Sequence, residues 1–279
     1  MSTHWSGMSR NWGETMPPLK PSPQDLEVFQ NASRQHLNET STVLILGVTQ
    51  ELYRLAWPLG TTIMAVDRNE DMIANVWPGP PGSALCADWR AIPLNPGLVQ
   101  VFLCDGGITC LSYPSGVRAV ATELRRIAAS PARAIVRLYV PPSVPEEPDE
   151  VLADLGAGRI SNLSEFKLRI ATAMQADPET GVTLADIWNV LERFAPDRNA
   201  LAKRIGWRRE HLDAIDTYRG STEIYRFPTL EQVALIFSAE GWRLSQDLHS
   251  EDSRCAFAFF DLETDADKPR SARPLTTFG

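Results

Sequence analysis

Residues 42–67 read TVLILGVTQELYRLAWPLGTTIMAVD, and this stretch decides the fold. Residues 43–46 form a short continuous apolar run, which indicates a strand buried on both faces. Gly47 ends the run, and a helical pattern over residues 50–55 follows until a Pro-Leu-Gly turn stops it. A second apolar strand at 63–66 then ends at Asp67. The order is therefore strand, glycine turn, helix, strand and acid.

The spacing between the glycine and the acid points to a nucleotide site. Gly47 and Asp67 are 20 positions apart. In a βαβ unit, this separation places the acid at the end of the second strand beside the ribose of a bound nucleotide. A dinucleotide fingerprint needs three glycines so that the backbone can approach a pyrophosphate, whereas this turn has one. Glu51 also places a negative charge in the first helical turn, where a phosphate would otherwise bind. We therefore expect an adenosine derivative with no phosphate at this turn.

This arrangement resembles the class I S-adenosylmethionine-dependent methyltransferases, with a single-glycine first motif. The resemblance implies an α/β fold: a Rossmann-like doubly wound sheet, mostly parallel with an antiparallel last strand, plus an α-helical insert. It also implies S-adenosyl-L-methionine as cofactor, with its methionine part at the glycine turn and its ribose hydroxyls on the acid. The residues assigned to the cofactor on this ground are Gly47, Val48, Thr49, Asp67 and Arg68.

The turn after the third strand extends the resemblance. A short strand at 84–87 leads into Asp88 and Trp89. In the resembling family an acid at this turn bonds the adenine amino group, and a neighbouring apolar side chain covers the ring. The alternative interpretation of Asp88 is an ordinary acid in a surface turn.

The fourth strand, around residues 99–103, ends in Cys104, Asp105 and a Gly106-Gly107 pair. Ligands of open α/β sheets bind beyond the carboxyl ends of strands near the switch point, so this turn should face Gly47. The resemblance implies that the turn holds the methionine amino group, which assigns Cys104, Asp105 and Gly106 to the cofactor. Asp105 either accepts a bond from that ammonium group or caps the loop.

The rest of the cofactor domain is predicted at 41–141 and 227–262. A helix from Ser115 is expected to close at Ser130-Pro131, before a fifth strand at 134–140. Near the end, strands at 242–248 and 255–262 are joined too closely for a parallel crossover, so they should pair antiparallel. A dinucleotide dehydrogenase half would instead end on another parallel strand.

Three other segments complete the domain organisation. Residues 142–226 carry helical patterns without strands, and we predict a helical insert that covers the substrate. The acidic run at 146–150 is expected to be a solvated helix start. Residues 1–40, with Trp5 and Trp12, are predicted to form a helical segment that either acts as a lid over the ligand or packs onto the sheet. Residues 263–279 are predicted to be a mobile tail.

Composition limits the partners. The 279-residue chain is 43% hydrophobic and has a net charge of −8, so it can bury a core but is poorly suited to nucleic acid. A basic stretch at 201–209 that resembles a helix-turn-helix is therefore interpreted as a plain helical hairpin. Four cysteines without metal-ligand spacing indicate a reduced, cytoplasmic protein with no metal site. No apolar run is long enough for a bilayer, and the start has no signal-sequence core.

Methyl transfer is an in-line displacement, so the protein mainly has to position the acceptor. Trp12, Tyr113 and Tyr139 are the candidates for contacting it. Of four histidines, only His4 and His211 lie in segments that could cover the site, and no catalytic base is assigned. We predict a methyltransferase acting on a small molecule. The alternative is a non-catalytic nucleoside-binding or partner-binding module on a degenerate methyltransferase fold.

Overall fold

A seven-stranded sheet forms the centre of the computed structural model, which describes residues 3–249 and 254–262. Neighbouring strands follow the order β3-β2-β1-β4-β5-β9-β8. The pairs from β3 to β5 are parallel, whereas β9 is antiparallel to both β5 and β8. The predicted Rossmann-like sheet with its antiparallel last strand is confirmed. The strands are β1 (Thr42–Leu46), β2 (Thr62–Asp67), β3 (Ala84–Cys86), β4 (Val99–Asp105), β5 (Ala128–Tyr139), β8 (Trp242–His249) and β9 (Cys255–Leu262).

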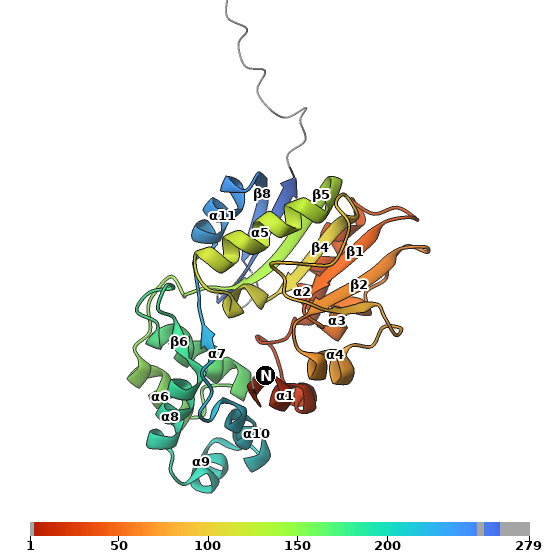
Figure 1. Cartoon of the computed structure of the whole chain (residues 1–279). Helices are drawn as coiled ribbons and strands as arrows, with labels where there is room; N and C mark the ends of the chain where they lie inside the picture. The colour runs from red at the N-terminus through yellow and green to blue at the C-terminus, as the bar shows by residue number, and fades with distance from the viewer. Residues whose placement is uncertain (1–2, 250–253, 263–279) are drawn as a thin grey trace, which may run out of the picture.

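Helices cover both faces of this sheet (Figure 1). Alternate residues of β1 point to opposite faces, and both sets are buried: Leu44 packs into one core and Ile45 into another. The core on the Leu44 side includes α5 (Ser115–Ile127) and α11 (Leu230–Ala239). The core on the Ile45 side includes α2 (Pro23–Arg34), α3 (Gln50–Tyr53) and α4 (Glu70–Val76).

Side-chain caps start three of the five helices that cover the sheet. The Ser22 and Thr229 hydroxyls and the Asn69 amide oxygen each accept a hydrogen bond from the backbone N–H three residues later. Such caps satisfy N–H groups that have no partner inside the helix. Asn162, Thr183 and Asp197 do the same in the insert.

Two predicted helix ends were wrong. Helix α3 stops at Tyr53, because the Trp57 indole N–H donates to the Tyr53 carbonyl and turns the chain away. Helix α5 ends at Ile127, and Ser130-Pro131 lies inside β5 rather than closing the helix. The register of β5 against β4 shifts in this part of the strand. A bulge of this kind tolerates a proline, which has no N–H to donate to the ladder.

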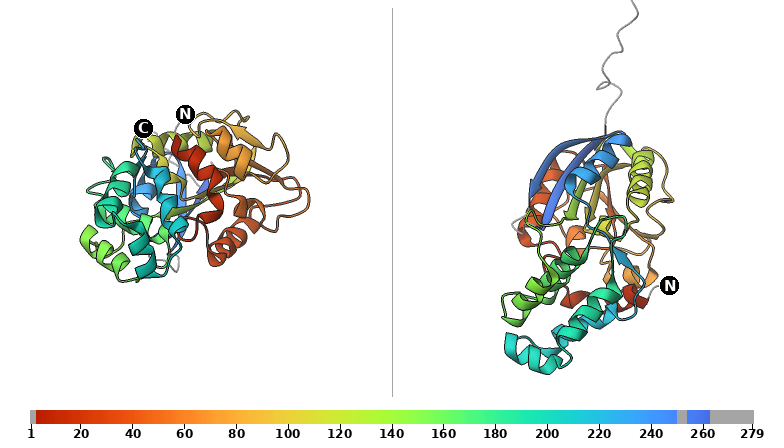
Figure 2. Two further views of the ribbon diagram at one scale, coloured as in Figure 1. Left: turned by 90° about the horizontal axis from the view of Figure 1, so that it is seen from below. Right: turned by 90° about the vertical axis from the view of Figure 1, so that its left-hand side faces the viewer.

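Beyond the sheet lies the helical insert, a separate lobe in Figures 1 and 2. It is not free of strands as predicted, because β6 (Val182–Thr183) and β7 (Ile224–Tyr225) pair antiparallel. The acidic run is also not simply solvated: Glu146 accepts hydrogen bonds from Arg169 and Arg254, each at 2.5 Å. The helices are α6 (Pro148–Gly156), α7 (Leu163–Met174), α8 (Leu184–Phe194), α9 (Arg198–Ile205), α10 (Arg209–Asp213) and the 3-10 helix η3 (Ala214–Tyr218).

The N-terminal segment lies between this lobe and the sheet. Helix α1 (Thr3–Arg10) packs against α4 and against η3 of the insert, and the 3-10 helix η1 (Trp12–Glu14) follows it. Figure 1 shows α1 beside α4 at the end of the sheet that faces the insert. No helix within 3–249 and 254–262 is both long and apolar enough to cross a membrane. The predicted mobile tail, 263–279, lies outside the described residues.

Candidate functional site

Two adjoining cavities lie at the carboxyl ends of β1, β2 and β4. The larger has a volume of about 260 Å³ and the smaller about 120 Å³. They share the lining residues Trp5, Asp67, Trp89 and Cys110. The turns after three parallel strands thus meet at one site, as expected for a ligand at the switch point of an open α/β sheet.

Asp67 lies where the two cavities meet. Its Oδ1 accepts a hydrogen bond from the Asn69 backbone N–H at 2.8 Å, and the side chain lines both cavities. Burial raises the pKa of this carboxyl to about 6, against the opposing effects of the Asn69 N–H and of Arg68. A half-buried carboxylate that lines both cavities is suited to accept hydrogen bonds from a diol.

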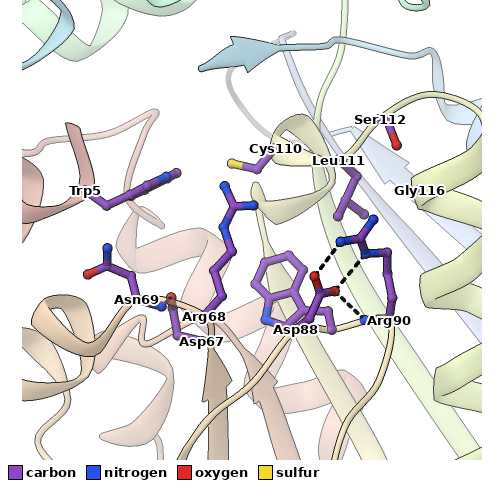
Figure 3. Close-up of a pocket in the computed structure, with 11 residues that line it drawn as sticks. Trp5, Asp67, Arg68, Asn69, Asp88, Arg90, Cys110, Leu111, Ser112 and Gly116 are labelled. Carbon is purple, nitrogen blue, oxygen red and sulfur yellow. Dashed lines mark hydrogen bonds and ion pairs between the residues drawn. The ribbon is translucent and has the colours of Figure 1, made fainter. Parts of the chain in front are cut away.

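The larger cavity also contains the acid of the third turn. Asp88 forms a two-pronged ion pair with Arg90, with Nε to Oδ1 at 2.8 Å and Nη2 to Oδ2 at 2.6 Å (Figure 3). The Arg90 guanidinium lowers the pKa of Asp88 to about 2, so the carboxylate is charged. Arg68 lines the same cavity and pairs with Glu223 at 3.3 Å.

Trp89 connects the two cavities. Its indole N–H donates to the Val66 carbonyl at 2.7 Å, which fixes the ring beside the end of β2. A Cβ added to Gly107 would lie 2.6 Å from this ring, so a side chain there is excluded. The ring therefore lies between the first and fourth strand ends, and its predicted role as a cover for adenine stays a prediction.

The fourth strand end is closed by ionic and aromatic contacts. Gly106 has a φ of +66°, and a Cβ there would lie 2.4 Å from the Tyr139 ring. Asp105 neither stands free nor caps the loop: its Oδ1 accepts a hydrogen bond from Arg137 Nε at 2.6 Å. Arg137 is fully buried on β5 and also contacts Asp25 at 3.5 Å. Asp105 therefore faces the smaller cavity as half of an ion pair.

The other predicted cofactor and acceptor residues divide into two groups. Two of them line neither cavity: Cys104 is buried in the core, and Tyr113 packs partly buried against the same core. Burial raises the pKa of Cys104 to about 12, so its thiol is neutral. The predicted residues that line the smaller cavity, besides the acids, Trp89 and Gly106, are Gly47, Val48, Thr49, Trp12 and Tyr139.

The two N-terminal tryptophans pack against the core and also line the smaller cavity. Trp5 and Trp12 are partly buried against the core on the Ile45 side, and both line the smaller cavity. The indole N–H of Trp12 is buried without a hydrogen-bond partner in the described part of the chain. A buried donor without a partner is unusual, and it is available to a ligand.

A tyrosine wall, which we define as Tyr139, Tyr218 and Tyr225, forms one side of the smaller cavity. Behind it lies His4, whose ring contacts the Thr217 carbonyl at 3.2 Å and the Tyr225 hydroxyl at 3.4 Å. Burial lowers the pKa of His4 to about 4, so it is neutral at neutral pH. A neutral ring donates from Nδ1 to the carbonyl and accepts from the Tyr225 hydroxyl at Nε2.

Several site residues were missed from the sequence. Tyr218 and Tyr225 come from the insert, and the hydrogen bond of the Arg226 N–H to the Thr109 carbonyl at 2.9 Å brings that segment to the fourth turn. No local sequence pattern predicts such a contact. Arg137 did leave a signal, because a lone arginine in an apolar strand needs a buried partner. His211 pairs with Arg208 and Glu14 and lines neither cavity.

Comparison with known proteins gives relatives over most of the chain. No family model matches it. Two curated proteins, from Mycobacterium avium and Mycolicibacterium paratuberculosis, are each 26% identical over 254 residues, covering 91% of this chain and 68% of theirs. Both are described as "Putative S-adenosyl-L-methionine-dependent methyltransferase".

Solved structures show likeness of fold alone. A chain from Rhodobacter sphaeroides described as "Putative Zn-dependent Alcohol Dehydrogenases" has a TM-score of 0.60 at 16% identity, covering 92% of this chain and 96% of its own. A chain from a Haloferax volcanii complex of the Trm112 methyltransferase activator with a "putative methyltransferase" has a TM-score of 0.51 at 10% identity, covering 95% and 99%. In the described part of the present chain, no group of three or more His, Cys, Asp or Glu could hold a metal ion.

Fold and site together define a class: a Rossmann-like domain whose cavities are lined by the acids at the ends of the strands. The antiparallel β9 between β5 and β8 distinguishes this sheet from a dinucleotide dehydrogenase half. With the two mycobacterial relatives, it makes the chain similar to the class I S-adenosylmethionine-dependent methyltransferases, with a single-glycine first motif.

Proposed function

We propose that the protein is an S-adenosyl-L-methionine-dependent methyltransferase that acts on a small-molecule acceptor. The observation that carries the proposal is the position of Asp67, which ends β2 and lines both cavities. A carboxylate in this position accepts hydrogen bonds from both hydroxyls of a ribose. The adenine would then lie on the Asp88 side and the methionine part on the Gly47 and Gly106 side.

The residues on both sides suit this ligand. The Gly47 turn has a φ of +93° and presents backbone without a side chain to the smaller cavity. No cluster of cations lines that turn to hold a pyrophosphate: in the described part of the chain, Lys20 already pairs with Glu51 at 3.5 Å. A nucleoside with an uncharged link to an amino acid fits such a turn better than a dinucleotide does.

The cofactor supplies a methyl group already activated by a sulfonium charge, so the chain mainly provides binding and orientation. Asp67 and the glycine turns hold the adenosine and methionine parts in place. Trp5 and Trp12 close the cavities from the N-terminal side and exclude water. The tyrosine wall is the remaining side of the smaller cavity, and the acceptor would lie there.

The test is calorimetric titration with S-adenosylmethionine and S-adenosylhomocysteine. Asp67→Asn removes the charge without changing the shape, and we expect affinity to fall by about tenfold or more, the loss of a hydrogen bond to a charged group. Glu70→Gln, an exposed neutralisation three residues away, is the matched control and should bind like the wild type.

Absence of heat with both ligands, in protein shown to be folded, would refute the site. Wild-type affinity in Asp67→Asn would refute the role of that residue. If the cofactor binds, release of S-adenosylhomocysteine in the presence of small-molecule acceptors separates an enzyme from a non-catalytic binding module.

A further inference from the structure

One buried lysine near the site has no negative partner. Lys167 of α7 is 7% exposed, and its Nζ lies 4.5 Å from the centre of the Tyr218 ring. Within the described residues its ammonium group makes no hydrogen bond and no ion pair. Burial alone lowers its pKa to about 8. At neutral pH the fold therefore keeps a positive charge here without compensation.

Other buried cations in the described part of the chain are treated differently. Arg137, Arg169 and Arg198 are each less than 9% exposed, as Lys167 is. Each of these arginines contacts two or three carboxylates within 4 Å, and Arg169 does so from the same helix as Lys167. Where a buried cation has a structural role, this fold neutralises it. Lys167 is the exception, and it lies behind the wall of a cavity.

The surroundings of Lys167 supply hydrogen-bond donors rather than negative charge. Burial raises the pKa of Tyr139, Tyr218 and Tyr225 above the ordinary value, so all three keep their phenolic protons. Burial also raises the pKa of Cys110 to about 12, which keeps that thiol neutral. His4 is neutral as well, and Lys167 contributes to lowering its pKa. This end of the cavity thus has a positive field and protonated phenols.

From these contacts we propose that the acceptor is a small aromatic carboxylic acid, bound as its anion against the tyrosine wall with Lys167 as the compensating charge. This rests on the proposed methyltransferase function. The aromatic lining of the smaller cavity, Trp5 and Trp12 together with the tyrosines, suits a flat ring. Lys167 is not among the lining residues, so it acts as a positioning residue through Tyr218 and through its field.

An anionic acceptor also explains a site without an assigned base. A carboxylate oxygen forms a bond to the methyl carbon while the carbon–sulfur bond breaks and its electron pair stays on sulfur. A methyl ester and a thioether result, and no proton has to move. Two opposite charges disappear in this step, which a water-poor cavity favours because neither charge is strongly solvated there.

The experiment uses the whole protein saturated with S-adenosylhomocysteine, whose binding is measured first. Benzoate and benzamide are then titrated into this complex in separate experiments, and their affinities are compared. Benzamide has the same shape as benzoate without the charge. We expect benzoate to bind at least about tenfold more tightly. Lys167→Met should abolish this preference and keep S-adenosylhomocysteine affinity within about twofold, whereas Lys167→Arg should retain part of the preference.

Lys203→Met, on the exposed side of α9, is the control and should leave the preference intact. Lys167→Met removes an uncompensated buried charge, so it is expected to fold. Equal binding of benzoate and benzamide, failure of benzoate to bind the S-adenosylhomocysteine complex, or an unchanged preference in Lys167→Met would overturn the inference. Failure of S-adenosylhomocysteine itself to bind would overturn the proposed function instead.

Discussion

Arg137 is the residue whose replacement the structure predicts most sharply. Its guanidinium is fully buried and donates to Asp105 Oδ1 at 2.6 Å and to the Pro18 carbonyl at 2.9 Å. Arg137→Met keeps most of the side-chain volume and removes both bonds. Hydrogen bonds to charged groups contribute about 1.5–3 kcal/mol each, and burying the methionine returns roughly 1–2 kcal/mol. We expect the free energy of unfolding to fall by about 3 kcal/mol, as for other buried pairs that lose one partner.

The dependence of this loss on pH identifies its cause. Burial raises the pKa of Asp105 even with Arg137 present, and without the arginine it should rise further. A carboxyl whose folded pKa lies above its unfolded pKa destabilises the fold at high pH, and this effect disappears below the unfolded value. The variant should therefore be most destabilised near pH 7, and the difference from wild type should shrink towards pH 4.

Urea unfolding followed by circular dichroism measures both effects. Arg137→Met with Asp105→Asn should recover at least half of the loss, because the carboxylate that loses its closest partner is neutralised, while Asp25 keeps its hydrogen bonds from Ser22. Arg133→Met is the matched control on the same strand, where a partly exposed pair with Asp261 should cost about 1 kcal/mol. A loss below 1 kcal/mol for Arg137→Met, or a loss that does not change with pH, would refute this account.

Two further predictions concern the cofactor site. Because the pKa of Asp67 is raised to about 6, its carboxyl is protonated at pH 5, so affinity for S-adenosylhomocysteine should drop about tenfold between pH 7 and pH 5. Calorimetry on Asp67→Asn should show no such change, and an equal change there would assign the effect elsewhere. Gly106→Ala should cost about 2 kcal/mol or more and weaken binding, because its Cβ would lie 2.4 Å from the Tyr139 ring. Gly82→Ala also has a positive φ but nothing within 4 Å, so thermal unfolding should show only backbone strain of about 1 kcal/mol.

The sheet could be predicted from the sequence because its signals are local. Apolar runs of strand length, single helical faces between them and an acid at a strand end need only a few neighbouring residues to be recognised. The antiparallel β9 followed from loop length alone, since β8 and β9 are too close in sequence for a crossover. The positions of Gly47 and Asp67 relative to the cavities depend on these same features.

The acceptor side could not be predicted in this way. Lys167 and Tyr218 belong to helices whose patterns specify an apolar core, and nothing local indicates which part of the insert meets the sheet. That placement depends on contacts between distant segments, such as His4 with Thr217 and Tyr225. The helical patterns therefore predicted the helices of the insert but not which of its residues line the cavity.

The structure also explains how one glycine can suffice at the first turn. Extra glycines there let a backbone approach a pyrophosphate, and a nucleoside without phosphates does not need that approach. At the fourth strand end, by contrast, there is no room for a side chain: a Cβ would lie 2.4 Å from Tyr139 at Gly106 and 2.6 Å from Trp89 at Gly107. A Cβ at Gly47 would meet only Trp89, at an ordinary 3.8 Å, so its φ of +93°, rather than crowding, favours glycine there. Backbone conformation therefore favours glycine at the first turn, whereas the lack of room for a Cβ requires it at the fourth strand end.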